Sequence, residues 1–478
     1  MLPCRMLRIH WQFTLFAAAT LAAAPLPPAS LLAARVSPVL PAAGSSPNPP
    51  PFGAFDIRAY GAIGNGVADC TAAIQAALDA AVGAGGGTVF IPAGVWRVAG
   101  GVTVAPPKTV PLSLRGEGWA SALLWERDAD LLTFAPANGE PLAHALLTDF
   151  AVFCGGAAPK SAASAALRFP AGIVRSTLST LLFYGSGPLP NASLGSAVAC
   201  GTNLDLGGRA VTDTVTVRDT LHWFFRGTGV IIGRGSEVRL LGGRLVGMGT
   251  RSDGSVGVHV TGNNGGVHVS ETDVIGLGTG VLLNNDSGAG SNRETFITHA
   301  TMDSDGVGLL VNDSSYVSVA GCWAASSDQA QVLLAEGAAG AHVAIVGGTI
   351  FNGGVLAPEG TCAAGNATLG CNGIEVRAGD FSLAGVLVWA NKGVGLHVAD
   401  PGVDGFTVNG CRFENNGQGA NIPAASGEFA FVGNVLRNNK LPSALGGDPS
   451  AVVASNVNAD GKVERRLAAA NAAASAGA

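Results

Sequence analysis

Charged side chains are scarce in this sequence. Asp, Glu, Lys and Arg make up 13% of the 478 residues, about half of the roughly 25% found in an average soluble protein. The net charge of −6 at neutral pH is spread thinly, and no block of basic residues occurs. A nucleic-acid-binding protein needs a basic patch to neutralise phosphates. We therefore expect no nucleic-acid partner.

Long hydrophobic runs are also missing, apart from one near the N-terminus. Phe13–Ala24 is apolar, follows Arg5 and Arg8, and ends in three alanines before Pro25. It is shorter than the roughly 20 residues that span a bilayer, and its layout is typical of a secretory signal peptide. We expect residues 1–24 to be a signal peptide, and the mature protein to be secreted to the extracellular space or cell wall, without a membrane partner.

Glycine is abundant instead, with 70 residues, about twice the usual share of roughly 7%. Many of these glycines belong to short rows that repeat through the second half of the chain. Positions one and three of a row are mostly apolar, and position five is usually Gly. The rows begin about 22–28 residues apart, except for a longer interval of 38 residues. The rows are VRLLGGRLVG from Val238, VHVSETDVIG from Val267, TFITHATMDS from Thr295, VSVAGCWAAS from Val317, VAIVGGTIFN from Val343, FSLAGVLVWA from Phe381, FTVNGCRFEN from Phe406 and FAFVGNVLRN from Phe429.

A repeat of this length, with two or three short strands and no helix, is typical of one coil of a parallel β-helix. Leucine-rich repeats would need a Leu/Asn consensus that is absent, and propeller blades need about 40 residues or more. We therefore predict an all-β solenoid over residues 55–440. Asn391, Asn416 and Asn439 share one offset in their rows, and we expect them to form a ladder of stacked amides at a bend.

One helix is predicted ahead of the repeats, over Thr71–Val82, before the strand Thr88–Ile91. A stacked solenoid has an open end with an apolar cross-section and unpaired strand edges, which must be covered. We predict that the apolar face of this helix caps that end. The face comprises Ala73, Ile74, Ala77, Leu78 and Ala81.

Composition marks further segments. Residues 25–54 are rich in Pro, Ala and Ser and are predicted to be a linker, and the Ala-rich residues 441–478 are predicted to be a flexible tail. N-glycosylation sequons, which would suit a secreted glycoprotein, begin at Asn191, Asn285, Asn312 and Asn366.

The cysteines allow one pairing to be predicted. Cys362 and Cys371 bracket a short loop in the longest interval between rows, and we expect them to form a disulfide, as a secreted protein allows. Cys322 and Cys411 share one column but lie three coils apart, about 14 Å. That is too far for a bridge, so both are expected to be buried free thiols. The sequence does not place Cys70, Cys154 and Cys200.

The segment AYGAIGNGVADCTAAIQAALDAAVGAGGGTVFIPAGVWRV resembles the N-terminal signature of the pectate-lyase-superfamily domain, in its rhamnogalacturonase/epimerase-like group. It departs from that signature at Asn65 and Cys70, where Asp is usual. Further along, GTRSDGSVGVHVTGNNGGVHVSETDVIGLGTGVLL is similar to a divergent polygalacturonase-like branch of glycoside hydrolase family 28. The resemblance covers about Phe55–Lys440. It implies a right-handed parallel β-helix and an activity directed at carbohydrate.

The resemblance also implies that Asp residues just before one strand of successive coils are catalytic. Asp303, Asp305 and Asp328 occupy these positions, and an inverting glycosidase needs two carboxyl groups about 6.5–9.5 Å apart. We therefore predict that these three residues are the acid/base group. Further residues are predicted to bind the substrate. An Arg side chain can pair with a uronate carboxylate, and a Trp ring can stack on a sugar. The predicted binding residues are Asp253, Arg251, Arg226, His259 and Trp223.

Other interpretations of these residues stay open. Asp-Gly at 253 and 305 is also an ordinary turn dipeptide, and Asp305 shares the offset of the Asn ladder. The usual polygalacturonase motifs Asn-Thr-Asp, Asp-Asp, Gly-His-Gly and Arg-Ile-Lys are absent. A pectate lyase would hold Ca²⁺ with several carboxylates, and no dense acidic cluster occurs.

The eight histidines show no metal-ligand spacing, so we expect no metal and no cofactor. Three functions remain: a polygalacturonase-like glycoside hydrolase, a uronate lyase or epimerase, and a catalytically silent glycan-binding β-helix. All three have a polysaccharide as substrate or ligand. We expect a monomer, with an oligomer also possible, and the particular polysaccharide is not determined by the sequence.

Overall fold

The computed structural model of the chain describes residues 54–106, 110–156, 158–185, 198–207, 211–249, 251, 253–262, 264–285, 292–357, 362, 370–423, 426–446, 450–458 and 463–464. The predicted signal peptide, nearly all of the predicted linker, and the sequons at Asn191 and Asn366 lie outside these ranges. Glycosylation at Asn285 and Asn312 stays a prediction. Both side chains are half-buried, and Asn312 Nδ2 donates a hydrogen bond to Asn284 Oδ1 at 2.9 Å.

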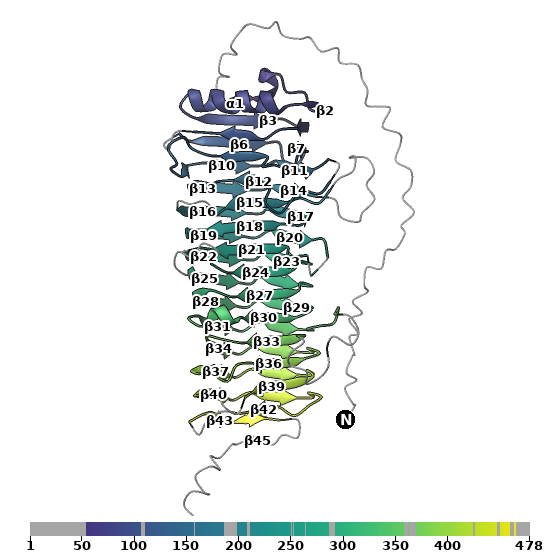
Figure 1. Cartoon of the computed structure of the whole chain (residues 1–478), viewed down its shortest axis with the longest axis vertical. Helices are drawn as coiled ribbons and strands as arrows, with labels where there is room; N and C mark the ends of the chain where they lie inside the picture. Colours follow the sequence, from purple (N-terminus) through teal and green to yellow (C-terminus); the bar gives the residue numbers. More distant parts are fainter. Residues whose placement is uncertain are drawn as a thin grey trace, which may run out of the picture. The chain divides into compact units, whose positions relative to one another are not determined.

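Successive coils contribute strands to three long sheets that run along the stack (Figure 1), and neighbouring strands pair in parallel except at the C-terminal end, where β44 and β45 are antiparallel. The predicted parallel β-helix is confirmed. Sheet A contains β1 Ala54–Asp56, β3 Gly87–Ile91, β6 Leu112–Gly116, β10 Leu146–Thr148, β13 Ile173–Ser179, β16 Thr212–Arg218, β19 Gly235–Leu241, β22 Gly265–Ser270, β25 Asn292–Thr298, β28 Ser314–Ala320, β31 His342–Val346, β34 Asp380–Ala384, β37 Phe406–Asn409, β40 Phe429–Val432 and β43 Val452–Ala454, with β9 Leu142–Ala143 beside β13.

Sheet B follows sheet A within each coil. It contains β2 Asn65–Asp69, β4 Gly94–Val98, β7 Ser121–Trp125, β11 Ala151–Cys154, β14 Leu182–Tyr184, β17 Leu221–Phe225, β20 Arg244–Gly247, β23 Asp273–Ile275, β26 Thr301–Asp303, β29 Trp323–Ala325, β32 Thr349–Phe351, β35 Leu387–Trp389, β38 Arg412–Glu414, β41 Val435–Arg437, β44 Asn456–Val457 and β45 Val463–Glu464.

Sheet C completes each coil. It contains β5 Val102–Val104, β8 Leu132–Phe134, β12 Ala165–Arg168, β15 Thr202–Leu206, β18 Thr228–Gly233, β21 Val256–Thr261, β24 Thr279–Leu283, β27 Val307–Val311, β30 Ala330–Leu334, β33 Asn372–Val376, β36 Val394–Val398, β39 Gln418–Ile422 and β42 Ala444–Leu445. Strand pairing continues past the predicted end at Lys440, because β43 pairs with β40 and β44 pairs with β41.

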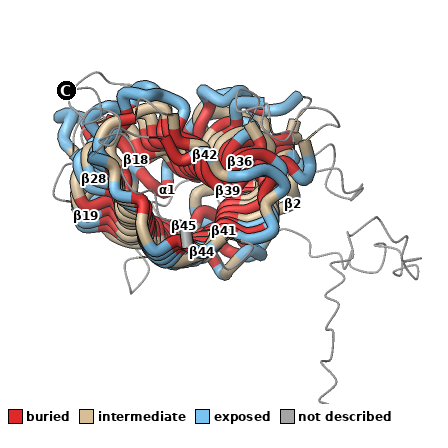
Figure 2. The backbone as a smooth tube through the Cα atoms, turned by 90° about the horizontal axis from the view of Figure 1, so that it is seen from below, coloured by how far each residue is buried: buried red, intermediate tan, exposed pale blue. Residues whose placement is uncertain are grey.

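The inward side chains of the three sheets form the core, which Figure 2 shows as buried residues lining the inside of the coils. Phe381, Phe406 and Phe429 illustrate the stacking, with ring centroids 4.6 and 4.8 Å apart and nearly parallel planes. This separation is the ordinary spacing of neighbouring strands. Position one is apolar in all rows but the one that begins at Thr295, because it stacks on its equivalents in the neighbouring coils.

The glycine at position five of each row turns the chain from sheet A to sheet B. One residue at this corner has a left-handed backbone, which Gly adopts without the steric cost that a Cβ brings. Where Gly is replaced by His299, φ is still +52°. The corner glycines have φ values from 62° to 68° and are Gly242, Gly321, Gly347, Gly385, Gly410 and Gly433.

The predicted asparagine ladder is present at the corner between sheets B and C. The backbone N and Nδ2 of Asn391 both donate to Asn416 Oδ1, at 3.0 and 2.9 Å. Asn416 donates in the same way to Asn439 Oδ1, at 3.0 and 3.2 Å. A second ladder, which the sequence reasoning missed, runs from Asn434 to Asn456 at the corner between sheets A and B.

The structure contains two disulfides among its described residues. The predicted bridge Cys362–Cys371 is confirmed. A second bridge joins Cys154 to Cys200, which are 46 residues apart in sequence and 5.4 Å apart between Cα atoms. The predicted free thiols of Cys322 and Cys411 are confirmed, and burial raises the pKa of both. Cys70 is also buried and free.

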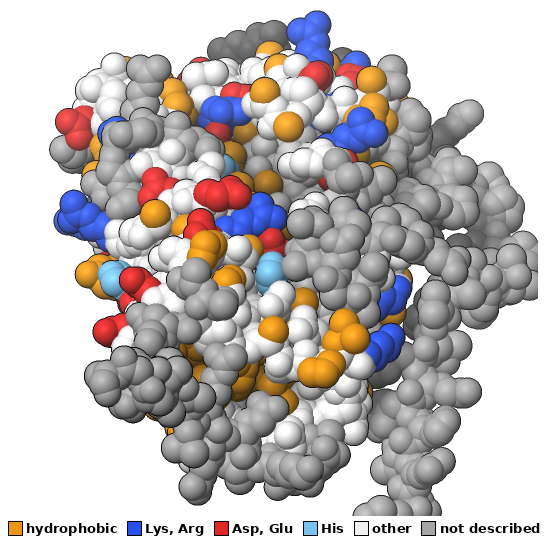
Figure 3. Space-filling model, turned by 60° about the horizontal axis from the view of Figure 1, so that its bottom comes forward, with side chains coloured by type: hydrophobic (Ala, Val, Ile, Leu, Met, Phe, Trp, Pro, Cys, Tyr) orange, Lys and Arg blue, Asp and Glu red, His pale blue; other side chains and the backbone are white. Residues whose placement is uncertain are grey.

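Positive and negative side chains are interspersed on the surface, as the face in Figure 3 illustrates. Many of them pair within or between coils. Arg168, for example, contacts both Asp130 and Asp205 at 2.7 Å. The surface therefore carries no extended field of one sign on that face. None of the described helices is long and apolar enough to cross a membrane.

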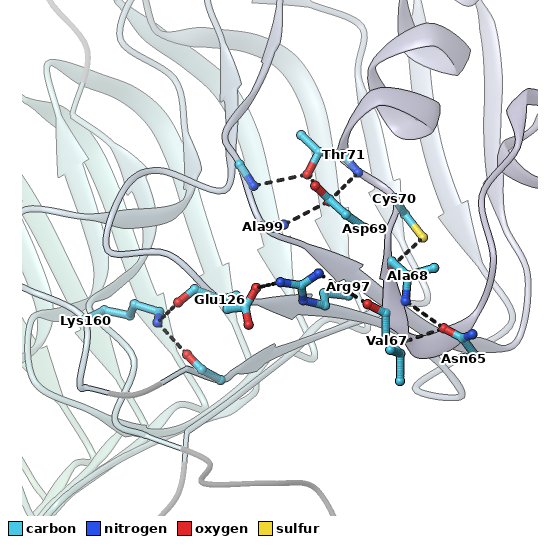
Figure 4. Close-up of polar contacts among 12 residues, drawn as sticks. Asn65, Val67, Ala68, Asp69, Cys70, Thr71, Arg97, Ala99, Glu126 and Lys160 are labelled. Atoms are coloured by element: carbon cyan, nitrogen blue, oxygen red, sulfur yellow. Dashed lines mark hydrogen bonds and ion pairs between the residues drawn. The ribbon is translucent and has the colours of Figure 1, made fainter.

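The N-terminal end carries the predicted helix α1 Thr71–Gly83, with the short 3₁₀ helix η2 Ile57–Tyr60 beside it. The predicted apolar face is the buried one, and the helix packs on β1, β3 and β5. Asp69 fixes the start of the helix, because its Oδ1 accepts hydrogen bonds from Thr71 N, Thr71 Oγ1 and Ala99 N (Figure 4). These bonds hold the pKa of Asp69 below its usual value.

The first coils are joined by a chain of polar contacts below this cap (Figure 4). Arg97 and Glu126 form an ion pair at 2.6 Å. Lys160 Nζ donates to the backbone carbonyls of Glu126 and Gly155 at 2.6 and 2.5 Å. Lys160 is 2% exposed, and its burial lowers its pKa. These contacts are structural, because both lysine bonds satisfy main-chain carbonyls.

Candidate functional site

The corner between sheets B and C brings together part of the predicted acid group. Arg251 Nη1 contacts Asp328 Oδ1 at 2.7 Å, and Arg251 Nε donates to Ser304 O at 2.8 Å. Ser304 lies between Asp303 and Asp305, so Arg251 contacts residues that lie two and three coils beyond its own. The Arg251 and Asp328 side chains are 19% and 24% exposed. Asp328 is therefore held in an ion pair at this corner.

The structure does not bring Asp305 to the surface. Its side chain is 0% exposed, so no polysaccharide reaches it in this conformation, and its predicted catalytic position is corrected. Its Oδ1 accepts a hydrogen bond from Leu277 N at 2.8 Å. Asn416 and Asn439 make the same contact to the backbone N of the preceding coil. Asp305 is therefore a carboxyl at the position of a ladder amide.

Glycines opposite the ladder confirm this equivalence. A Cβ on Gly280 would lie 2.6 Å from Asp305 Oδ2, and a Cβ on Gly395 would lie 3.1 Å from Asn416 Nδ2. The Asp305 Oδ2 atom has no hydrogen-bond partner. Burial raises the pKa of Asp305 well above its usual value, because an enclosed carboxylate lacks the hydration that stabilises its charge.

We expect Asp305→Asn to increase the free energy of unfolding by about 1–3 kcal/mol at neutral pH, because an amide can continue the hydrogen bonds of the ladder and has no proton to lose on unfolding. A raised pKa means that the folded wild type keeps a proton that the unfolded chain loses above pH of about 4. Wild-type stability therefore falls as pH rises from about 4 toward the raised pKa, and the asparagine variant escapes this loss. Urea unfolding at pH 4 and pH 7 measures the difference.

The advantage of Asp305→Asn must shrink at the lower pH. A variant less stable than wild type at pH 7, or an advantage that is independent of pH, would contradict the ladder interpretation. Asp303→Asn is the matched control, because Asp303 lies two residues away on the half-exposed face of β26.

The predicted substrate-binding residues do not share one surface. Trp223 lies in the sheet B column of Asp303 but three coils away, roughly 14 Å. His259 projects from sheet C, where it pairs with Leu282 of the next coil. Asp253 accepts hydrogen bonds from Ser255 N and Oγ at 3.0 and 2.6 Å. These contacts make Asp253 a turn residue, as the Asp-Gly dipeptide allows.

Arg226 is exposed at the turn between β17 and β18. Its backbone N donates to Cys200 O at 2.9 Å. Among the described residues, the Arg226 side chain forms no ion pair with Asp328, so the structure does not join Arg226 and Arg251 into one uronate site.

A different group of side chains that could transfer protons lies on the outer face of sheet A. Tyr316, His342 and Asp380 occupy one register position on three successive coils, β28, β31 and β34. The Tyr316 and His342 rings stack with centroids 5.5 Å apart, and His342 Nδ1 lies 3.0 Å from Asp380 Oδ2. Tyr316 is 60% exposed. The three residues line a groove of about 290 Å³ together with Phe296.

A second groove continues along the same sheet. Its volume is about 590 Å³, and Arg234, Glu237, Arg293 and Glu294 line it. Glu294 on β25 pairs directly with Tyr316 on β28, so the two grooves meet at this step. The combined surface, which we call the sheet A groove, places arginines beside an accessible Tyr–His–Asp series.

The sequence contained a signal for this series. Tyr316, His342 and Asp380 each immediately precede position one of their rows, so they form a column when the rows are aligned. Position one faces the core, and the residue before it must face outward because side chains alternate along a strand. Alignment on the apolar positions alone missed this column.

Another histidine–carboxylate pair is closed to solvent. His397 and Glu375 are adjacent on sheet C but are 7% and 5% exposed. Arg377 pairs with Glu375 at 2.7 Å, and burial lowers the pKa of His397. In the described ranges, no three His, Cys, Asp or Glu side chains are placed to hold one metal ion.

Comparisons with known proteins support the sequence resemblance at the N-terminus. Residues 54–124 match the family described as rhamnogalacturonase A/epimerase, pectate lyase-like. Mannuronan C5-epimerase AlgE5 of Azotobacter vinelandii is 62% identical over 47 residues, which cover 10% of this chain and 5% of the relative. Alginate lyase 7 of the same organism is 55% identical over 47 residues, covering 10% of this chain and 6% of the relative. The matched segment is the cap with the first coils, so it assigns no residue of the sheet A groove.

Solved structures support the fold of the whole stack. The A-module of A. vinelandii mannuronan C-5 epimerase AlgE6 superposes with a TM-score of 0.51 and 16% identity, covering 85% of this chain and 99% of that chain. Tailspike protein 3 of bacteriophage CBA120 has a TM-score of 0.55 and 11% identity, covering 86% of this chain and 62% of that chain. At these identities the likeness shows the fold alone. The chain therefore carries the signature of a pectate-lyase-like, rhamnogalacturonase A/epimerase domain at residues 54–124 and folds as a parallel β-helix like the AlgE6 A-module.

Proposed function

We propose that this protein modifies an acidic polysaccharide by removing the proton beside a uronate carboxylate, which is the step shared by uronate lyases and C5-epimerases. The observation that carries the proposal is the accessible series Tyr316–His342–Asp380 on successive coils. The relatives named as mannuronan C5-epimerases and an alginate lyase support this chemistry better than hydrolysis.

The roles follow from the chemistry of each side chain. A neutral His342 imidazole can accept the C5 proton, and Asp380, which contacts its other ring nitrogen at 3.0 Å, orients it. Negative charge then develops on the uronate carboxylate. We assign the binding of that carboxylate to Arg293, which lies one coil before Tyr316 and lines the adjoining groove, because a guanidinium offers a fork of N–H donors.

Tyr316 completes the reaction as the proton donor. If its hydroxyl protonates the departing glycosidic oxygen at C4, a double bond forms between C4 and C5 and the chain is cut. If a proton instead returns to C5 from the opposite face, the configuration inverts and the chain stays intact. Both outcomes conserve atoms and need no oxidant or reductant.

Hydrolysis remains a second candidate, because Arg251 and Asp328 do meet at the corner between sheets B and C, close to Asp303. A hydrolase needs one protonated and one ionised carboxyl, both accessible to substrate. Asp305 has the raised pKa but is enclosed, so this corner lacks an accessible acid. The polygalacturonase-like interpretation therefore has weaker support than proton abstraction.

The product formed from polymannuronate, alginate or polygalacturonate in D₂O tests the proposal. We expect deuterium to be incorporated at C5, detected by NMR, or unsaturated chain ends to form, detected by ultraviolet absorbance. Reducing ends without unsaturation or C5 exchange would support the hydrolase instead. Binding of these polymers without any reaction would support a catalytically silent β-helix.

A further inference from the structure

Sheet B carries a run of aromatic side chains on its outer face. Trp323, Phe351 and Trp389 come from the successive strands β29, β32 and β35. The Trp323 and Phe351 rings lie 5.4 Å apart, and the Phe351 and Trp389 rings lie 4.8 Å apart with planes 23° from parallel. We call these three residues the sheet B aromatic face.

Both tryptophans of this face expose a large part of their surface to solvent. Trp323 is 41% exposed and Trp389 is 38% exposed, whereas Trp96 and Trp125 are 2% and 1% exposed. Exposed aromatic surface loses the free energy that burial would contribute. Contiguous exposed apolar groups commonly mark a binding surface.

Charged groups border this face at its C-terminal end. Glu414 pairs with Trp389 in the next coil, and both Arg412 and Arg437 contact it, at 2.8 and 3.0 Å. Glu414 is only 8% exposed, but the two arginines are 53% and 51% exposed. Each guanidinium has five N–H donors, so donors remain available for an anionic ligand beyond the aromatic rings.

We propose that the sheet B aromatic face, with Arg412 and Arg437, is a second and non-catalytic binding surface for an acidic polysaccharide. The glycan lies along the coil axis, its sugar rings stack on Trp323 and Trp389, and a carboxylate reaches the arginines. Coils repeat about every 4.8 Å, which is close to the length of one sugar unit in an extended chain. The sheet B aromatic face belongs to a different sheet from the sheet A groove. Binding at this face does not depend on the proton abstraction proposed for that groove.

The double variant Trp323→Ala/Trp389→Ala tests this surface by affinity electrophoresis in native gels containing polymannuronate, polygalacturonate or neutral dextran. We expect the variant to weaken binding to the acidic polymers by about tenfold, as the loss of two aromatic contacts implies. Added salt should weaken wild-type binding to the acidic polymers. Trp119→Ala is the matched control, because Trp119 is 44% exposed near the N-terminal cap; its affinity should stay within about twofold of wild type.

Unchanged affinity in the double variant, or equal retardation by dextran, would overturn the proposal. So would sedimentation showing that wild type is a dimer and the double variant a monomer, because the face would then bind a second copy of the chain. Circular dichroism checks the fold, and Trp389→Phe, which keeps an aromatic ring, should retain binding.

Discussion

Replacing His342 with Asn is expected to lower the rate of C5 proton exchange on the responsive polyuronate by about 10²–10⁴-fold. This is the usual contribution of a general base, and asparagine cannot accept the proton. His342 is the only residue of the sheet A series that combines an acceptor nitrogen with a bonded orienting carboxylate at 3.0 Å. The initial rate of deuterium incorporation measures the effect directly, whichever product forms.

A matched histidine separates chemistry from folding. His299 is exposed at the corner after β25, where φ is +52°, a conformation that Asn tolerates well. His299→Asn should therefore leave the rate and the unfolding midpoint unchanged.

Tyr316→Phe should abolish the step that needs the proton donor while preserving the ring stack. A folded His342→Asn variant with wild-type exchange would remove His342 from the mechanism.

Replacing Asn416 with Ala is expected to lower the free energy of unfolding by about 2–6 kcal/mol. The loss is large because Asn416 is 0% exposed and occupies the middle of the ladder. Its removal leaves the backbone N of Asn391 and the carbonyl of Val388 without their partners. Each buried group left unpaired costs about 1–3 kcal/mol.

The matched control is Asn409→Ala, because Asn409 is an exposed asparagine on β37 in a neighbouring part of the stack. Asn409→Ala should change the free energy of unfolding by less than about 0.5 kcal/mol. Denaturant unfolding followed by circular dichroism compares the two. A repeat protein can unfold in segments, so the shape of the transition should also change if the ladder joins neighbouring coils. Equal effects of the two substitutions would contradict the structural role of the ladder.

The fold was predictable because its causes repeat along the chain. The apolar residue at position one stacks on its equivalents in neighbouring coils, as Phe381, Phe406 and Phe429 do. The Gly at position five adopts the left-handed backbone conformation at the corner between sheets A and B. The capping helix was predictable for a related reason. An open solenoid end must be covered, and one amphipathic segment stood ahead of the repeats.

The candidate site was harder to predict, because it depends on which of the residues stacked from coil to coil are exposed to solvent. Asp305 matched both a catalytic position and a ladder position, and only burial separates the two, since an Asp-Gly turn is compatible with either. The column Tyr316–His342–Asp380 was visible in principle, but its importance depends on a groove that forms only when coils stack.

The sequence by itself determined the solenoid, its cap, the asparagine ladder and the short-range disulfide Cys362–Cys371, because each follows from local spacing. The tertiary structure alone decided the pairing of Cys154 with Cys200, the enclosure of Asp305, and the meeting of the arginine-lined and Tyr–His–Asp grooves. These features join residues of different coils. Their contact depends on the register between coils and on the lengths of the intervening loops, which no single repeat encodes.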